Sequence, residues 1–214
     1  MRKLVIIGAG GHAVSVANVA ICAGFEIISF VDSNKAGSKL LNREIIGNIN
    51  SLLDPFEFEF SIAIGDNYSR SKVFYDLIHH FPGMNFPALI HPSAIVSNFS
   101  TLDMGVTLMP LSLVGPNVRI GKFCILNSHS SIDHDSSMAE FASLAPGAVL
   151  GGAVNVGERS ALSIGAIVKH GVQIGRDSVL GANSYLNEDL GERLVAYGSP
   201  AKAFKKRNPQ DPYL

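Results

Sequence analysis

The sequence predicts two structural units joined end to end: a small parallel α/β domain in residues 1–86 and a parallel β-helix in residues 87–214. Strand-like and helix-like segments alternate before residue 86, and an aliphatic side chain recurs every six residues from Ile90 onward. Only 16% of the residues are charged, whereas 47% are hydrophobic. This composition excludes a disordered chain. A formal net charge of −1 gives no argument for nucleic-acid binding.

The α/β domain is predicted from short apolar runs. Three strands are expected, at Leu4–Ile7, Ile27–Val31 and Phe60–Ile64. Helices are expected over residues 14–21, where apolar side chains have helical spacing, and over residues 70–80, which are followed by Pro82 and Gly83. Strands that alternate with helices form a parallel sheet, and this domain is long enough for only about half of a dinucleotide-binding fold.

The β-helix is predicted from a six-residue repeat. Seventeen positions spaced by six, from Ile90 to Leu186, are all aliphatic or Met, and the positions two before them are all small or Val. Because a strand alternates its faces with a period of two, both sets point inward. Stacked units of one short strand and one corner then bury a continuous apolar column. Glycines just after the aliphatic position, such as Gly115 and Gly151, are expected to supply the turn backbone.

A glycine-rich loop follows the first predicted strand. Gly8, Gly10 and Gly11 lie in the run Gly-Ala-Gly-Gly-His-Ala, which opens a helix. Such a loop lets the backbone approach a diphosphate, and the helix N-terminus offers it free N–H groups. Asp32 ends the second strand and is expected to accept hydrogen bonds from a ribose or a base. The domain is therefore predicted to bind a diphosphate ligand with one nucleoside; the alternatives are a tight turn without a ligand and a nicotinamide-dependent oxidoreductase.

Further substrate-binding positions are expected near the carboxyl ends of the strands, where parallel sheets collect their ligands. The predicted positions are His12, Lys35, Gly65, Asp66, Asn67 and Arg70. His12 is expected to face a phosphate or the active centre. Helix capping is the alternative role for Asp66 and Asn67.

His134 is predicted to act as a general base. It lies in the run Ser-Ile-Asp-His-Asp-Ser, where Ile132 is a core position, so Asp133, His134 and Asp135 occupy an outward-facing corner. A carboxylate beside an imidazole holds its tautomer and raises its basicity. Either aspartate fits that role, and an exposed corner histidine without a catalytic role is the alternative.

A metal site is the alternative for the histidines of the repeat. His134 and His170 occupy equivalent positions two coils apart, about 10 Å along the axis, which is too far for a shared metal within one chain. A site across subunits with His129 stays open, but no metal is predicted.

The motifs GAGGH, FVDS, IAIGDN, LNSHSSIDHD and YGSPAK together resemble the hexapeptide-repeat sugar acetyltransferases, over about residues 2–204. The similarity is greatest to the sugar-nucleotide N-acetyltransferases of the bacillosamine type, with the sialic-acid O-acetyltransferases further off. The resemblance implies a Rossmann-like N-terminal domain that holds the sugar nucleotide and a left-handed β-helix with three strands per coil. It also implies a homotrimer with acetyl-CoA in the cleft between neighbouring helices.

The same resemblance assigns roles to single residues. His134 matches the catalytic base, Asp135 its acidic neighbour and Asn127 an active-site amide, while Gly152 falls where a backbone N–H polarises the thioester carbonyl. Ser143 stands where some relatives place a second histidine, which argues against a two-histidine mechanism. The residues expected to bind acetyl-CoA are Gly152, Gly181, Ala182, Pro200 and Lys202, and the basic residues Lys205, Lys206 and Arg207 are expected either to attract its phosphates or to form a solvated tail.

The predicted function is acetyl-CoA-dependent N-acetylation of the amino group of a nucleotide-linked amino sugar. A 4-amino-4,6-dideoxy sugar on UDP or dTDP is expected, for surface polysaccharide or glycoprotein glycan synthesis. The alternatives are O-acetylation of a sugar such as sialic acid, an NAD-dependent oxidoreductase, a non-catalytic nucleotide-binding trimer and a metal hydratase. A cytoplasmic location is expected, because the two cysteines form no motif and no signal peptide or membrane span is recognisable.

Overall fold

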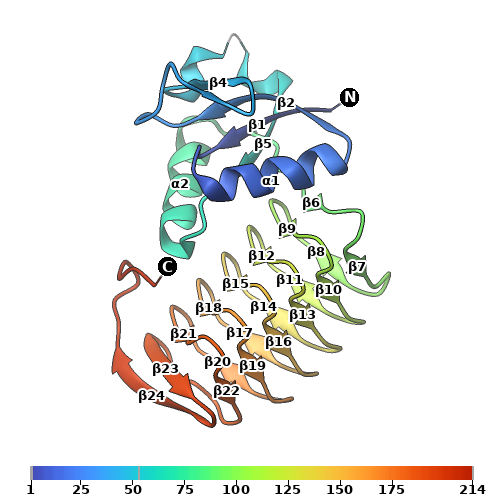
Figure 1. The fold of residues 1–214 in the computed structure, drawn as a ribbon, viewed down its shortest axis with the longest axis vertical. Coiled ribbons are helices and arrows are strands. Elements are labelled where there is room, and N and C mark those ends of the chain that lie inside the picture. The colour runs from blue at the N-terminus through green and yellow to red at the C-terminus, as the bar shows by residue number, and fades with distance from the viewer. Residues whose placement is uncertain (1, 53, 214) are drawn as a thin grey trace.

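The computed structural model describes residues 2–52 and 54–213 and shows an α/β unit set on one end of a parallel β-helix (Figure 1). The elements of the α/β unit are β1 (Arg2–Ile7), α1 (Gly11–Cys22), β2 (Phe25–Val31), β3 (Lys39–Leu40), β4 (Arg43–Ile46), two short 3₁₀ turns (Ile49–Ser51 and Pro55–Glu57), β5 (Glu59–Ile62) and α2 (Asn67–His80). Its sheet has the order β3-β4-β2-β1-β5, parallel except for the β3–β4 hairpin, which the sequence did not predict.

The β-helix is built from strands of two residues each. They are β6 (Leu89–Ile90), β7 (Ile95–Val96), β8 (Thr101–Leu102), β9 (Thr107–Leu108), β10 (Leu113–Val114), β11 (Arg119–Ile120), β12 (Ile125–Leu126), β13 (Ser131–Ile132), β14 (Ser137–Met138), β15 (Ser143–Leu144), β16 (Val149–Leu150), β17 (Asn155–Val156), β18 (Ala161–Leu162), β19 (Ile167–Val168), β20 (Gln173–Ile174), β21 (Val179–Leu180) and β22 (Tyr185–Leu186). Every third strand pairs in parallel, which gives three sheets along the solenoid. An antiparallel pair, β23 (Leu194–Gly198) and β24 (Ala201–Lys206), extends the sheet that starts at β6.

The predicted register of the repeat is confirmed. From Leu108 to Leu186 every aliphatic position is buried in one continuous cluster, and small residues such as Ala142 and Ala148 fill the positions between them. Ile90 and Val96 belong to the first coil and are less buried, because no coil precedes them.

The turn chemistry differs from the prediction. Positive φ angles occur three residues after the aliphatic position, at residues such as Asn117, Asp135 and Phe141, and the glycine one residue after it keeps an ordinary φ. The glycines are needed for space instead. A Cβ on Gly151 would lie 2.8 Å from the backbone nitrogen of His170 in the next coil. The short backbone approach between coils, not a left-handed turn, therefore selects glycine there.

Three outer faces of the β-helix differ in character. The face of β8, β11, β14, β17 and β20 carries polar or partly exposed side chains such as Thr101, Arg119 and Gln173. The face that runs from β7 to β22 carries the exposed apolar side chains Ile95, Leu113, Val149 and Ile167, and we call it the apolar face. On the third face the outward side chains Ile125, Ala161, Val179 and Val195 are buried.

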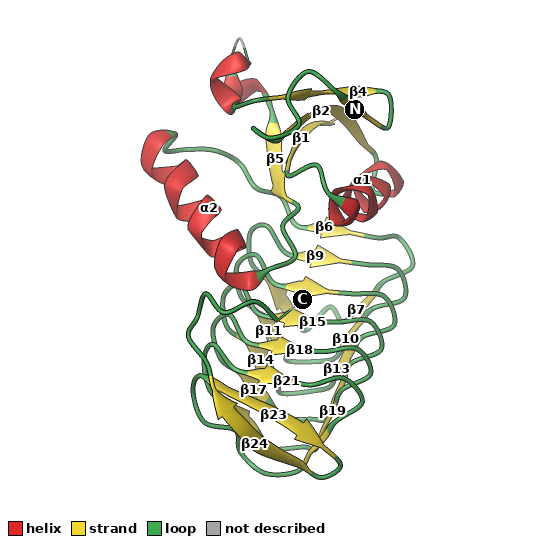
Figure 2. Cartoon of the chain, turned by 60° about the vertical axis from the view of Figure 1, so that its left-hand side comes forward, coloured by secondary structure: helices red, strands yellow, loops and turns green. Residues whose placement is uncertain are grey.

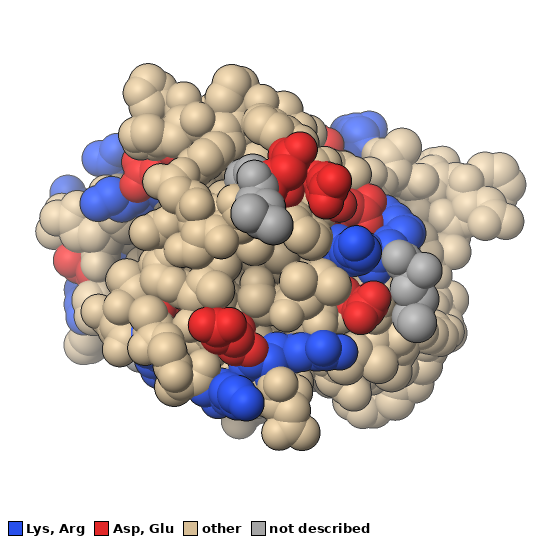
Figure 3. Space-filling view, turned by 90° about the horizontal axis from the view of Figure 1, so that it is seen from above, with Lys and Arg blue, Asp and Glu red and all other residues tan. Residues whose placement is uncertain are grey.

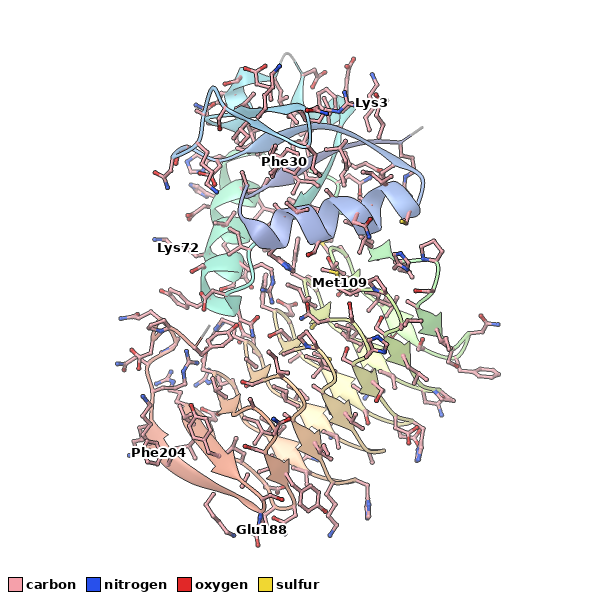
Figure 4. All side chains as sticks on the ribbon, viewed as in Figure 1. Lys3, Phe30, Lys72, Met109, Glu188 and Phe204 are labelled. Carbon is pink, nitrogen blue, oxygen red and sulfur yellow. The ribbon has the colours of Figure 1, made fainter. Side chains whose placement is uncertain are left out.

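The α/β unit and the β-helix pack together without a linker. Met109 of the β-helix lies beneath α1 and joins the core of the α/β unit (Figure 4). Phe123 and Phe141, stacked with 5.6 Å between ring centroids, pack against Phe74 of α2. In Figure 2 one end of α2 lies against the coils. No helix within the described residues is long and apolar enough to cross a membrane.

Candidate active site

The first candidate region is a cavity of about 750 Å³ at the carboxyl ends of β1, β2 and β5. The glycine loop forms one wall. Gly8 has a φ of +107°, and a Cβ there would lie 2.9 Å from the carbonyl oxygen of Ala63, so Gly8 is required by the turn itself. A Cβ on Gly10 or Gly11 would meet no atom of residues 2–52 and 54–213 within 4 Å. Those two glycines leave open space at the N-terminus of α1, as a diphosphate would need.

Two polar residues predicted for this region lie at the cavity or beside it. Asp32 lines it, and its Oδ1 accepts a hydrogen bond from the Asn34 N–H at 3.0 Å, so its second oxygen is left for a ligand. Lys35 donates from Nζ to the carbonyl oxygen of Ala9 at 2.7 Å and thereby holds the glycine loop. The structure thus gives Lys35 a supporting contact under the loop.

His12 lies where this cavity meets a second one, and it lines both. Its Nε2 is buried and has no hydrogen-bond partner among the described residues. Burial, together with the positive charge of Arg70, lowers the pKa of His12 to about 4. The ring is therefore neutral near pH 7, with an unpaired nitrogen available to a ligand.

Asp66, Asn67 and Arg70 all lie in the first turn of α2 or directly before it. Asp66 caps α2, with Oδ1 accepting from the Ser69 N–H at 2.8 Å. Arg70 is 1% exposed, and its guanidinium donates to the carbonyl oxygens of four residues and to Oδ1 of Asn67. The four are Ile64, Gly65, Phe123 and Phe141.

Asn67 completes this contact between the two units. Its Nδ2 donates to the carbonyl oxygens of Arg159 and Ser160, both at 3.1 Å. Every donor of Arg70 and the amide of Asn67 are thus used inside the protein. Asn67 and Arg70 therefore fasten the α/β unit to the β-helix, which corrects the expectation that they contact a ligand. Asp66 has the alternative role, helix capping. Gly65, in contrast, lines both cavities.

His134 projects from the corner that follows β13, and its side chain is 57% exposed. Its Nδ1 lies 2.8 Å from Oδ2 of Asp135, while Asp133 accepts from the His134 backbone N–H. Asn117, one coil earlier, donates to the other oxygen of Asp135 at 3.1 Å. Asp135 is therefore the aspartate that touches the ring, and its own orientation is held by Asn117.

The electrostatics of this corner favour a basic imidazole. The hydrogen bond that His134 donates to Asp135, followed by the charge of Asp133, raises the pKa of His134 above its ordinary value of 6.5. The same hydrogen bond, followed by that from Asn117, lowers the pKa of Asp135. With Nδ1 engaged by the carboxylate, Nε2 is the nitrogen that can take a proton from a substrate.

Gly152 lies one coil further along, directly beside the imidazole. A Cβ on Gly152 would be 2.6 Å from Nε2 of His134 and 2.7 Å from Cε1. Gly152 is buried under the ring. Any side chain at residue 152 would displace the imidazole from this position. The geometry brings the predicted base and the predicted oxyanion donor together.

Asn127 lies on a different edge of the β-helix. We call the corners after β10, β13, β16 and β19 the His134 edge, and those after β9, β12, β15, β18 and β21 the Asn127 edge. The apolar face separates these two edges within one chain. His134 and Asn127 thus do not share a pocket in the single chain, although both were predicted for one site.

The second cavity, about 590 Å³, lies along the Asn127 edge and is mainly apolar. Asn127 lines it, and its Nδ2 donates to the carbonyl oxygen of Leu144 at 2.8 Å. Gly181 and Ala182 line it as well, and a Cβ on Gly181 would collide with the ring of Tyr197.

Some residues predicted to bind acetyl-CoA lie elsewhere. Pro200 is in the turn between β23 and β24, and Lys202 contacts Glu188 at 3.3 Å; neither lines the cavity. Lys205 does line it. Arg207 is buried and donates to the carbonyl oxygen of Asp177 at 2.8 Å, which corrects the expectation of a solvated or phosphate-binding side chain.

Tyr213 and Tyr197 also line the second cavity and were missed from the sequence. Tyr213 follows the last hexad by many residues, so its place could not be read from the repeat. An aromatic residue near the end of a largely polar tail was the available signal. Within residues 2–52 and 54–213, no three His, Cys, Asp or Glu side chains converge as a metal site.

Comparisons with known proteins bear on the whole chain. The family model for the PglD N-terminal domain matches residues 3–77. GDP-perosamine N-acetyltransferase of Escherichia coli O157:H7 is 25% identical over 214 residues, covering 94% of this chain and 96% of that protein.

Two solved structures are more similar still. One is a histidine-to-asparagine variant of perosamine N-acetyltransferase from Caulobacter crescentus, in complex with CoA and GDP-perosamine, with TM-score 0.89 and 31% identity; 96% of this chain and 98% of that chain are covered. The other is the acetyltransferase domain of PglB from Neisseria gonorrhoeae, in complex with acetyl coenzyme A, with TM-score 0.88 and 32% identity; 95% and 99% are covered. The predicted fold, with its left-handed β-helix, is confirmed. The chain belongs to the hexapeptide-repeat sugar N-acetyltransferase family that these enzymes represent.

Proposed function

We propose that this protein transfers an acetyl group from acetyl-CoA to the amino group of a nucleotide-linked amino sugar, with His134 as the general base. The observation that carries the proposal is the contact of His134 with Asp135 on one side and with Gly152 on the other. Residues 1–86 serve as the nucleotide-binding domain and residues 87–214 as the acetyltransferase domain. The similar enzyme from Caulobacter crescentus holds GDP-perosamine, so a GDP-linked sugar joins the UDP- and dTDP-linked sugars as a candidate substrate.

The chemistry follows from the arrangement of the corner. An ammonium has no lone pair, so the sugar amine attacks the thioester carbon as its proton passes to Nε2 of His134. Asp135 keeps Nδ1 protonated and compensates the imidazolium that forms. The Gly152 N–H stabilises the oxyanion of the tetrahedral intermediate, a contribution worth about 3 kcal/mol when one such donor is lost in other enzymes. CoA then leaves as a thiolate.

The sugar nucleotide occupies the 750 Å³ cavity, with its diphosphate against Gly10 and Gly11. Asp32 contacts the ribose or the base of the nucleotide. His12 contacts a phosphate or the sugar that faces the active centre. The 590 Å³ apolar cavity, with Gly181 and Ala182 in its wall, suits the pantetheine arm of acetyl-CoA.

The complete active site lies between neighbouring copies of the chain. The apolar face lies between the His134 edge and the Asn127 edge, and its exposed Ile95, Leu113, Val149 and Ile167 need cover. In a cyclic trimer around this face, the His134 edge of one copy meets the Asn127 edge of the next. Such an assembly brings His134 of one copy close to Asn127 and the second cavity of the next copy. Within a single chain these residues are apart.

A thiol-release assay with acetyl-CoA tests the function directly. UDP-, dTDP- and GDP-linked 4-amino sugars are compared, and mass spectrometry of the product identifies an amide or an ester. We expect turnover with at least one of them, an amide product, and a loss of about 100-fold or more in kcat for His134→Ala while CoA still binds. Turnover of none of the panel, near-normal turnover by His134→Ala, or an ester product would each count against the corresponding part of the proposal. Tight NAD binding would favour the oxidoreductase, and stoichiometric zinc the hydratase.

A further inference from the structure

Residues 207–213, which we call the tail segment, run back from β24 over the buried outer face of β18, β21 and β23. Arg207 holds the segment from within. Its guanidinium donates to the carbonyl oxygen of Asp177 at 2.8 Å and to the carbonyl oxygens of Pro209 and Asp211. The Asn208 N–H adds a bond to Oδ2 of Asp211 at 2.7 Å. The tail segment is thus folded against the β-helix by its own contacts.

Tyr213 is the residue of the tail segment that reaches the α/β unit. Its ring packs on Ala161, Val179 and Val195. Its hydroxyl oxygen accepts a hydrogen bond from the Asn67 N–H at 2.8 Å. Burial is the largest of the causes that raise the pKa of Tyr213, so its hydroxyl stays protonated near neutral pH.

The Asn67 N–H belongs to the turn that lies beside both cavities. Asn67 begins α2, and Gly65, two residues earlier, lines both cavities together with His12. Arg70 also binds this turn: its Nη1 donates to the carbonyl oxygens of Ile64 and Gly65, both at 2.9 Å. The turn is therefore held between Arg70 within the protein and Tyr213 of the tail segment.

We propose that Tyr213 is a positioning residue for acetyl transfer: its hydroxyl fixes the Gly65–Asn67 turn, so that the tail segment couples the sugar-nucleotide cavity to the acyl-donor cavity. The inference rests on the proposed function for the identity of the two ligands. The tail segment also closes one side of the second cavity, through Arg207, Asp211, Pro212 and Tyr213. The tail segment then forms part of the wall of the acyl-donor cavity and also supports the turn beside the nucleotide cavity.

The test uses Tyr213→Phe, which keeps the ring on Ala161, Val179 and Val195 and removes only the hydroxyl. Tyr68→Phe is the matched control, because Tyr68 lies on the same helix and its hydroxyl makes no hydrogen bond with the described residues. We expect Tyr213→Phe to raise the KM for the sugar nucleotide about tenfold, since a buried N–H loses its partner. The value of kcat should stay within about twofold, because the His134 corner is not touched.

Hydrogen–deuterium exchange of the peptide that covers residues 65–70 gives a second readout that needs no substrate. Faster exchange there in Tyr213→Phe, with an unchanged melting temperature, is the expected result. A role in packing alone predicts wild-type KM and wild-type exchange, and this result would overturn the inference. If the wild-type protein acetylates no nucleotide-linked sugar, the proposed function fails, and the exchange measurement still decides whether Tyr213 holds the turn.

Discussion

Replacing Gly152 by Ala tests whether the imidazole of His134 must lie where the structure has it. The added methyl would lie 2.6 Å from Nε2 of His134, whereas non-bonded heavy atoms keep about 3.5 Å apart, so the ring must move by about 1 Å. A displacement of that size costs a catalytic group about 100-fold, or about 2.7 kcal/mol of transition-state stabilisation. Because the His134 side chain is largely exposed, the ring can swing outward at little cost in stability.

The assay is steady-state thiol release at saturating acetyl-CoA, with circular dichroism to follow unfolding. Gly191→Ala is the matched control, because among the described residues its methyl would meet only the flexible end of Leu194, at 3.3 Å. We expect kcat to fall about 100-fold for Gly152→Ala and to stay near wild type for Gly191→Ala. The variant keeps the backbone N–H of residue 152, so the loss reports the position of the base. Wild-type turnover in a folded Gly152→Ala protein would refute the assigned position of the ring.

Four further predictions concern the pH dependence, the nucleotide cavity and the assembly. Asp135→Asn removes the largest cause that raises the pKa of His134, so the acidic limb of the kcat/KM profile should move to lower pH. An acidic limb at the wild-type pH would show that Asp135 does not set the pKa of the catalytic base. Because the pKa of His12 is lowered to about 4, the unfolded chain binds more protons between about pH 4 and 6.5, and wild-type protein should lose up to about 3 kcal/mol of unfolding free energy as the pH falls through that range. His12→Gln should lose correspondingly less in urea titrations, and equal slopes would contradict the pKa. Gly11→Ala should weaken sugar-nucleotide binding about tenfold or more in calorimetry without lowering the melting temperature, because the methyl enters open space. Val149→Glu should dissociate the assembly in sedimentation experiments and abolish turnover; an intact active trimer would exclude the apolar face as the interface.

The β-helix could be predicted well because its signal is periodic. A single register accounts for the inward side chains from Leu108 to Leu186, and each is buried. What the register could not show is which corner position adopts the positive φ, because Asn, Asp, Phe and Arg occupy it more often than Gly. The glycines of the repeat report close contact between coils, which depends on the three-dimensional stack.

The site was harder to predict wherever a residue type fits two physical roles. Arg70 follows a strand end and was expected to bind the substrate, but from the first turn of α2 its side chain directs every donor onto the protein's own oxygens. Arg207 was grouped with a basic tail, yet it is the side chain that folds the tail. Asn127 and His134 are seven residues apart, and only the three-sided coil shows that they face different edges.

The fold also explains why only 16% of the residues are charged. Outward positions on one face are covered by the chain itself, and those on the apolar face carry exposed aliphatic side chains in place of charged ones. The acidic and basic side chains seen from the α/β end are interspersed with uncharged surface (Figure 3). The Asp133–His134–Asp135 corner is therefore one of the few clusters of ionisable side chains on a β-helix that is poor in charge.

Complementation between two inactive variants tests most directly that His134 catalyses acetyl transfer in a site shared between copies. His134→Ala and Asn127→Ala are each expected to release little thiol alone. Randomly mixed trimers, formed by co-expression and verified by native mass spectrometry, should contain an intact pair at about a quarter of their interfaces. Recovery of roughly a quarter of wild-type thiol release is then the predicted result. Verified mixed trimers that stay as inactive as either parent would contradict the shared site.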